Sequence, residues 1–168
     1  ETTLKELRSK KLSNGEELPT LENYLLQGSK DKKVKLIVEI KPAKNEALEN
    51  EIVAKTLKII QGLKLENQCE FISFSLNICK EIKKLQPQLM VQYLKGDLTP
   101  KQIKDLHIDG LDYHYTLFQK NATWIAEAKD LGLVTNSWTV NDEVVYQELK
   151  TMGINFITTN IPETLKNK

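Results

Sequence analysis

A glutamate and a lysine at the end of an apolar run are the residues of this sequence best suited to chemistry. Residues 34–40 (VKLIVEI) are rich in β-branched side chains, which predicts a strand ending near Glu39 and Lys41. Successive side chains of a strand point to opposite faces. One face would carry Leu36, Val38 and Ile40, and the other Ile37, Glu39 and Lys41. A carboxylate beside an ammonium suits binding of a cation or an anion, and a plain ion pair at a solvated rim explains the same spacing.

Polar and aromatic side chains also gather at the ends of the other apolar runs. They are Ser73, Phe74, Gln92, Tyr93, Tyr113, His114, Tyr115, Trp138, Thr139, Asn141, Thr158, Thr159 and Asn160. Brought together at one rim, such groups suit a small substrate that is polar and partly apolar. For each aromatic residue taken singly, packing in the core is the alternative. Helix capping accounts for Asn141 and Asn160.

Strand and helix patterns alternate along the chain and must position these residues. The periodicity predicts strands over residues 34–40, 69–74, 89–94, 110–113, 133–138 and 154–159. It predicts helices over residues 4–10, 20–26, 45–62, 76–86, 99–106, 121–131 and 141–153, and a last one from 162. Such alternation is typical of parallel strands joined by right-handed crossovers, an α/β fold.

Two architectures fit this alternation: an open doubly wound sheet and part of a (β/α)8 barrel. An open nucleotide-binding sheet carries a glycine-rich turn after an early strand. Here the first strand runs into Glu39-Ile40-Lys41-Pro42, without a glycine. We therefore favour the barrel, in which catalytic groups stand at the carboxyl ends of the strands.

Composition excludes several other classes of protein. The 168 residues suit a single domain, and Lys plus Arg total 24 against 23 Asp plus Glu. Arg8 is the only arginine, so we expect no nucleic-acid partner. No apolar run reaches the roughly 18 residues that cross a bilayer, so we expect no membrane span. Cys69 and Cys79 do not have the spacing of a metal site, so we expect two buried thiols. They leave the compartment undecided between cytoplasmic and secreted.

Five segments in register resemble the glycerophosphodiester phosphodiesterase family. Residues 36–41 (LIVEIK) are similar to its strand motif, and residues 18–22 (LPTLE) to the segment that precedes that strand. Residues 72–74 (ISF), 138–141 (WTVN) and 157–162 (ITTNIP) resemble three later motifs. Their order and spacing match along essentially the whole chain. Each motif alone is weak, whereas five in register are specific.

The resemblance implies a TIM barrel that hydrolyses glycerophosphodiesters to glycerol phosphate and an alcohol. Members hold a divalent metal, usually Ca or Mg, with three carboxylates, and use two histidines as general acid and base. By this resemblance Glu39 is the third metal carboxylate, Lys41 neutralises the phosphate and Trp138 lines the glycerol side. Three further residues are expected in the substrate wall, namely His114, Tyr93 and Phe74.

The chain also departs from the family. The family's His-Arg strand, Glu-x-Asp strand and His-Asp pair are not found, so both catalytic histidines and two metal carboxylates are missing. His107 and His114 occur too late to replace them, and Asn160 stands at the family's closing Asp. We therefore expect residues 1–168 to form one domain, an incomplete barrel without its first two strands and inactive alone.

Three explanations for this gap stay open. The chain belongs to a longer enzyme, or it pairs with a separate N-terminal segment or another copy, or it is a truncated relative that binds or assembles without catalysis. A different barrel phosphodiesterase, similar to phosphatidylinositol phospholipase C, is the remaining alternative for the chemistry.

Overall fold

A computed structural model describes residues 2–166 as six strands and nine helices. The strands are β1 (Leu36–Glu39), β2 (Cys69–Ser73), β3 (Val91–Tyr93), β4 (Gly110–His114), β5 (Val134–Trp138) and β6 (Phe156–Ile157). The helices are α1 (Leu4–Arg8), α2 (Leu21–Gly28), α3 (Glu46–Leu63), α4 (Leu76–Leu85), α5 (Pro100–Asp105), α6 (Tyr115–Lys120), α7 (Trp124–Asp130), α8 (Glu143–Met152) and α9 (Pro162–Lys166).

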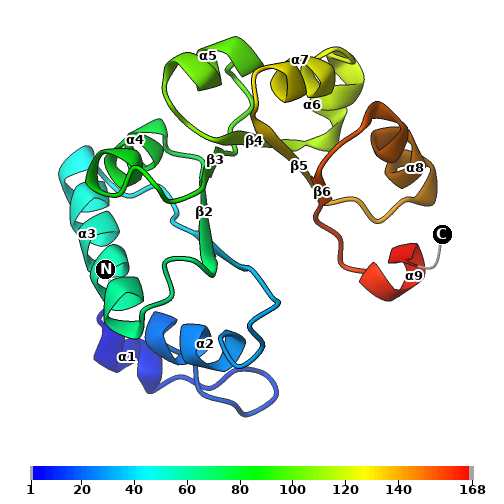
Figure 1. The fold of residues 1–168 in the computed structure, drawn as a ribbon. Coiled ribbons are helices and arrows are strands. Elements are labelled where there is room, and N and C mark those ends of the chain that lie inside the picture. Colours follow the sequence, from blue (N-terminus) through cyan, green and yellow to red (C-terminus); the bar gives the residue numbers. More distant parts are fainter. Residues whose placement is uncertain (1, 167–168) are drawn as a thin grey trace.

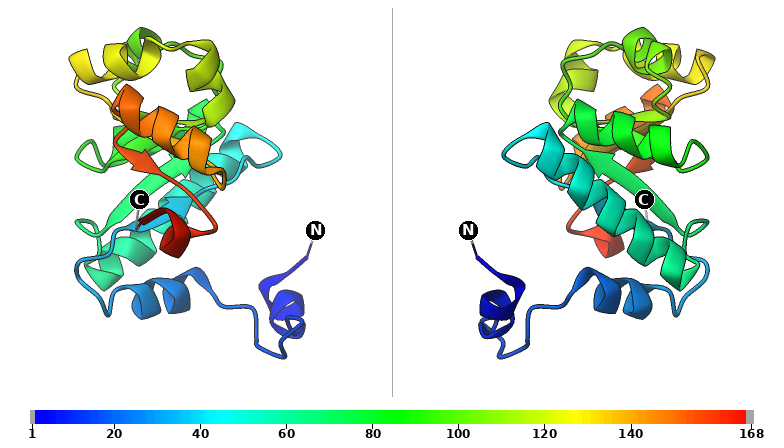
Figure 2. Two further views of the ribbon diagram at one scale, coloured as in Figure 1. Left: turned by 90° about the vertical axis from the view of Figure 1, so that its right-hand side faces the viewer. Right: turned by 90° about the vertical axis from the view of Figure 1, so that its left-hand side faces the viewer.

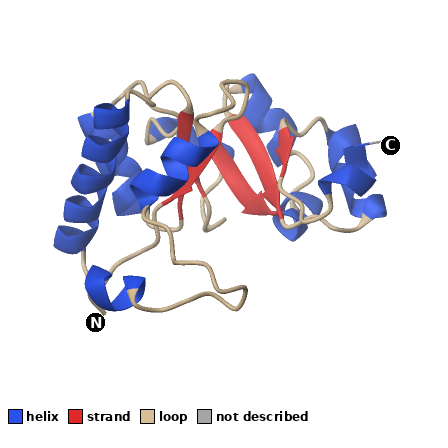
Figure 3. Cartoon of the chain, turned by 90° about the horizontal axis from the view of Figure 1, so that it is seen from below, coloured by secondary structure: helices blue, strands red, loops and turns tan. Residues whose placement is uncertain are grey.

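The strands form one parallel sheet in the order in which they occur along the chain, β1-β2-β3-β4-β5-β6. The sheet curls into an arc, and helices cover its convex side (Figure 1). This confirms the expected incomplete TIM barrel. Among the described residues β1 pairs only with β2, and β6 only with β5. The arc is therefore open between its first and last strands (Figures 1 and 3).

The hydrophobic core lies between the sheet and the helices. In β2 the side chains of Phe71 and Ser73 are buried, whereas Ile72 between them is partly exposed. The register pairs Phe71 with Val91 and Ser73 with Tyr93, so the same face continues into β3. This face belongs to the same hydrophobic core as side chains of α3, α4, α5 and α7, and the intervening side chains of β2 and β3 belong to the opposite, concave face.

Caps and turns confirm most of the predicted helix starts. Asn45, Ser75 and Thr99 accept a hydrogen bond from the backbone N–H three residues later. The cap of α8 was predicted wrongly: Asp142, and not Asn141, accepts from the N–H groups of Val144 and Val145.

The region after β4 also differs from the prediction. One helix was expected over residues 121–131, but α6 begins directly at the end of β4 and α7 begins only at Trp124. His114 caps α6 by accepting from the N–H of Thr116. No loop residues separate β4 from α6, so the sequence offered no punctuation to mark this helix.

Two further predictions concern the cysteines and the membrane. Cys69 and Cys79 are buried free thiols, as expected, and burial raises the pKa of Cys79 to about 12. Within the described residues, no helix has the length and apolar character of a membrane span. Helix α1 buries no residue and lies apart from the barrel body (Figure 2).

Candidate active site

A cavity of about 290 Å³ lies at the carboxyl ends of the strands on the concave side of the arc. Its lining comes from β1, β2, β4, β5 and the segments that follow β1, β2, β3, β5 and β6, and consists of Glu39, Lys41, Ile72, Phe74, Leu94, Asp112, Trp138, Thr139 and Thr158. Four of the six residues predicted for the site, namely Glu39, Lys41, Phe74 and Trp138, are brought together here. The alternation of side chains along each strand explains how distant segments meet at this point.

Glu39 and Lys41 form an ion pair at the mouth of the cavity. The Lys41 ammonium lies 3.1 Å from Glu39 Oε1, and the side chains are 79% and 31% exposed. A pair so open to solvent contributes little to stability. The lysine is therefore free to exchange its partner for another anion.

Buried hydrogen bonds fix the backbone that carries this pair. Ser73 Oγ donates to the Ile40 carbonyl at 2.6 Å, which ties the end of β1 to β2. The buried Glu49 side chain accepts from the Ala43 N–H and from the Ser75 hydroxyl. Sequence reasoning missed this role of Glu49. Its partner Ser75 is 26 residues away, so no local pattern indicates the contact.

Aromatic rings form one wall of the cavity. Trp138 meets Phe74 edge to face at a centroid distance of 5.7 Å, and His114 at 5.2 Å. The Trp138 indole N–H donates to the Asp112 carbonyl at 2.9 Å. His114 also stacks on Tyr115 at 4.4 Å. The indole is thereby held rigidly, with its ring available to the apolar part of a ligand.

Tyr93 does not belong to this wall, so the prediction for it needs correction. It is 2% exposed, lies on the convex face of β3, and donates from its hydroxyl to Asp97 at 2.9 Å. Burial and this carboxylate raise the pKa of Tyr93. The neighbouring Leu94 reaches the cavity instead, because adjacent side chains of a strand alternate between faces.

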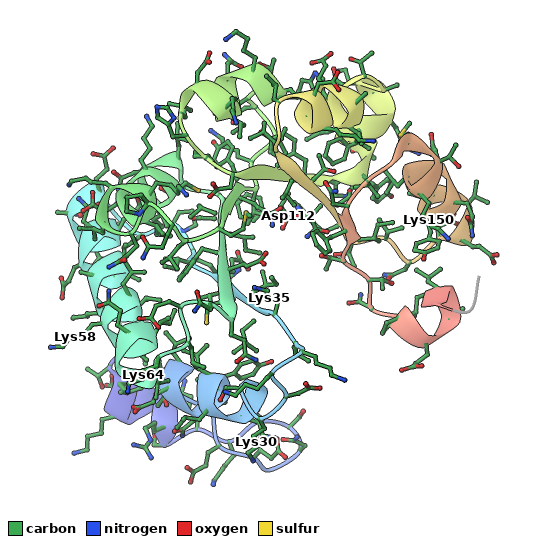
Figure 4. The ribbon with its side chains drawn as sticks, viewed as in Figure 1. Lys30, Lys35, Lys58, Lys64, Asp112 and Lys150 are labelled. Atoms are coloured by element: carbon green, nitrogen blue, oxygen red, sulfur yellow. The ribbon has the colours of Figure 1, made fainter. Side chains whose placement is uncertain are left out.

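Asp112 is a cavity residue that the sequence did not single out. Its side chain is on the concave face of β4, is 2% exposed, and leaves Oδ1 without a hydrogen-bond partner (Figure 4). Burial raises the pKa of this carboxyl to about 7; a hydrogen bond from Asn136 acts against that rise, and the charge of Glu39 adds to it. A buried carboxylate without a cation is costly in a structural role and typical of a functional site.

Asn141 and Thr158 organise the last part of the rim. Asn141 Oδ1 accepts from the N–H of Asn160 at 2.9 Å and from the hydroxyl of Thr159. Thr158 Oγ1 accepts from the Asn136 amide at 3.1 Å. Asn141 thus joins the segment after β5 to the segment after β6, a role different from the predicted cap.

The oxygen donors of the cavity are those that Ca or Mg prefers, but they do not make a full set. Glu39 and Asp112 are the two carboxylates in the lining. Nowhere in residues 2–166 do three His, Cys, Asp or Glu side chains gather as a cation site would require. Glu39 and Asp112 are therefore the carboxylates of this cavity that could contribute to such a site.

Comparison with known proteins identifies the family. The model of the glycerophosphoryl diester phosphodiesterase family matches residues 1–164. The chain belongs to this family. No curated protein matches the chain.

Solved structures of family members have the same fold. A glycerophosphodiester phosphodiesterase from Parabacteroides distasonis is 39% identical, with a TM-score of 0.96 over 98% of this chain and 69% of that chain. A candidate glycerophosphoryl diester phosphodiesterase from Silicibacter pomeroyi is 22% identical, with a TM-score of 0.88 over 99% of this chain and 67% of that chain. A phosphodiesterase from Oleispira antarctica in complex with the product sn-glycerol-3-phosphate is 21% identical, with a TM-score of 0.73 over 90% and 61% of the two chains.

Proposed function

We propose that this chain is the larger part of a barrel that hydrolyses glycerophosphodiesters to glycerol phosphate and an alcohol. The observation that carries the proposal is the cavity where Glu39, Lys41 and Trp138 meet at the carboxyl ends of the strands of a family member. The Oleispira antarctica phosphodiesterase, of the same fold, is described with sn-glycerol-3-phosphate as its product. That product has the phosphate and the glycerol that such a cavity would accept.

Lys41 is the residue suited to the phosphate. Its ammonium is exposed, and among the described residues its ion pair is with Glu39, 3.1 Å away, so an arriving phosphodiester can take the place of Glu39 beside the lysine. Glu39 is then released to act as a cation ligand. A bound divalent cation supplies Lewis acidity and neutralises charge on the phosphoryl oxygens. We assign Lys41 to orientation of the phosphate and neutralisation of its charge.

Trp138, Phe74 and His114 are suited to the glycerol side of the substrate. The Trp138 ring lies edge to face against both Phe74 and His114 and covers a wall beside the polar mouth. Such a surface excludes water from the carbon atoms of glycerol while its hydroxyls reach Thr139 or Thr158. His114 Nδ1 is engaged with Thr116, which leaves this residue a wall group and not a general base.

Catalysis requires the closed barrel. Ile37 on β1 and Phe156 on β6 face the concave side and are 50% and 58% exposed. In the described part of the chain, neither edge strand has a partner on its outer side. We infer that two further strands close the arc, cover these side chains, and add the remaining cation ligands and the acid and base. The 168-residue chain alone is then expected to hydrolyse nothing.

The test compares the chain with a closed form of it. The chain is fused behind the first two strand–helix units of a family member, and both proteins are assayed with glycerophosphodiesters of different alcohols and with phosphatidylinositol. We expect release of glycerol phosphate by the fusion alone, its loss on chelation of divalent cations, and its recovery on addition of Mg or Ca. Hydrolysis of phosphatidylinositol alone would contradict the assigned substrate class, and a folded, closed but inactive fusion would indicate a binding module.

Matched lysine variants test the assigned role. Lys41→Met in the fusion should lower kcat/KM by about 100-fold or more, which is the range for removal of one charge-stabilising group. Lys44→Met, an exposed lysine nearby, serves as the control and should leave kcat/KM unchanged.

A further inference from the structure

Two buried acceptors on the concave face of the sheet have no hydrogen-bond donor among the described residues, and one of them, on Asp112, belongs to the cavity lining. Asp112 Oδ1 and Gln92 Oε1 have no hydrogen-bond partner in the described structure, and their residues are 2% and 3% exposed. Asp112 lies on the inner side of the arc, on β4 (Figure 4), and Gln92 lies on the same side of the adjacent strand β3. Buried polar atoms without partners are rare in folded proteins and call for a specific explanation.

A glycine leaves room for the Gln92 side chain. A Cβ on Gly110 would lie 3.1 Å from Gln92 Cγ and would also clash with the Val134 carbonyl oxygen. A larger residue at this position would displace the backbone of β5 or the Gln92 side chain.

Positive charge is missing where the acceptors need it. The ion pairs of the described residues include none to Asp112, and Lys41 at the mouth is paired with Glu39. A hydrogen bond from Asn136 acts to lower the pKa of Asp112. The Asn136 amide also donates to Thr158 Oγ1, and the Asn136 carbonyl oxygen accepts from the Ser137 N–H. The protein groups around Asp112 are thus already committed.

We propose that Asp112 is a further ligand of the divalent cation to which Glu39 is assigned. It would bind the ion directly or through one water. The two carboxylates come from β4 and β1 and line the same cavity. A Ca or Mg ion prefers oxygen ligands such as carboxylates, and Glu39 and Asp112 supply two of them in this cavity. Such an ion would satisfy the unpartnered Asp112 oxygen and offset the repulsion between the two carboxylates. The inference rests on the proposed function, since it extends the same cation site.

Terbium ions, which report binding through emission excited by nearby tryptophan, test the proposal on the 168-residue chain itself. Trp138 lines the cavity and is the expected donor, so Trp138→Phe should abolish most of the sensitised emission. Asp112→Asn and Glu39→Gln should each weaken binding by about tenfold or more, a range known for metal ligands and the groups that support them. Asp105→Asn is the matched control, because this exposed aspartate pairs with Lys101 on α5. Ca and Mg should compete with terbium for this site, and their affinities should fall in the same variants.

Three results would overturn the proposal: no saturable emission from the wild-type chain either alone or in the closed fusion, equal affinity of wild type and Asp112→Asn, or an equal loss in Asp105→Asn. Circular dichroism and urea unfolding verify that Asp112→Asn is folded.

The closed fusion separates this inference from the proposed function. If the fusion hydrolyses glycerophosphodiesters and Asp112→Asn raises KM at unchanged cation affinity, Asp112 contacts the substrate and the inference is wrong. If the fusion is inactive yet cation affinity depends on Asp112, the inference stands and the proposed function fails.

Discussion

Two aspartates near opposite ends of β4 have opposite surroundings. Asp109, just before the strand, has both carboxylate oxygens within 3.1 Å of the Lys83 ammonium, and its Oδ2 also accepts from the Val91 N–H at 2.9 Å. Asp112, inside the strand, is more deeply buried and has an oxygen without a partner. At Asp109 the sheet is thus completed by groups of the chain itself, whereas among the described residues the Asp112 carboxyl keeps one oxygen without a partner.

This difference separates stability from function in the way expected of a barrel. Groups at the amino ends of the strands join elements together, and groups at the carboxyl ends serve chemistry. Lys83 also donates to the carbonyls of Pro87 and Leu89, which fastens the segment after α4 to the sheet. Among the described residues no ion pair includes Asp112, and its Oδ1 has no hydrogen-bond partner. Such a buried oxygen is typical of a functional site.

The largest expected effect concerns the pH dependence of stability. The pKa of Asp112 is raised from 3.8 to about 7 in the folded chain. Between these values the folded state holds a proton that the unfolded state has lost, so stability falls as pH rises from about 4 to 7. The full difference corresponds to about 4 kcal/mol at cation-free conditions, as an upper bound. Asp112→Asn carries no charge and should remove this loss.

Urea unfolding at several pH values between 4 and 8, with a chelator present, measures the effect. The difference in unfolding free energy between wild type and Asp112→Asn should widen as pH rises and level off above about 7. Asp105→Asn should show no such trend. A constant difference across this range would show that Asp112 titrates as an ordinary exposed carboxyl.

Removal of the Lys83 ammonium beside Asp109 should change the unfolding free energy in the opposite direction from Asp112→Asn and by a smaller amount. Lys83→Met leaves the Asp109 carboxylate without its ammonium, and we expect a loss of about 2 kcal/mol in unfolding free energy. This figure is below that of a fully buried pair, because the two side chains are 13% and 30% exposed. Lys84→Met provides the control: its pair with Glu81 leaves the lysine 72% exposed and should cost less than about 1 kcal/mol. Similar losses in both variants would contradict the contrast between the two ends of β4.

A third and smaller effect concerns the indole that joins Asp112 to the aromatic wall. Trp138→Phe removes the N–H that donates to the Asp112 carbonyl at 2.9 Å and keeps an aromatic ring beside Phe74 and His114. We expect a loss of about 1 kcal/mol, the net value of one hydrogen bond. Thermal and urea unfolding measure this loss. A variant as stable as wild type would show that the indole is held by ring packing alone.

The sequence predicted well those features that follow from local periodicity. Alternation along residues 34–40 placed Glu39 and Lys41 on the concave face, and the series of strand and helix patterns predicted the strand order. Tyr93 shows the limit of this reasoning, since proximity to a strand end was given more weight than the face on which the residue lies. Asp112 was missed because it lies within a short strand, where its two apolar neighbours hide a buried charge. Glu49 was missed because its partner Ser75 comes from the next strand–helix unit.

The smallest expected effect tests whether the Glu39–Lys41 ion pair at the mouth of the cavity contributes to stability. Glu39 and Lys41 are 3.1 Å apart, but the pair is open to solvent, so its coupling free energy should be below about 1 kcal/mol. A double-mutant cycle with Glu39→Gln and Lys41→Met, followed by urea unfolding at neutral pH, measures this coupling, and the exposed pair Lys11–Glu17 gives a matched reference. Weak coupling would leave Glu39 and Lys41 available to a cation and a phosphate, respectively. A coupling of about 2 kcal/mol or more would make the pair structural and would remove the argument that the two residues exchange partners when a substrate binds.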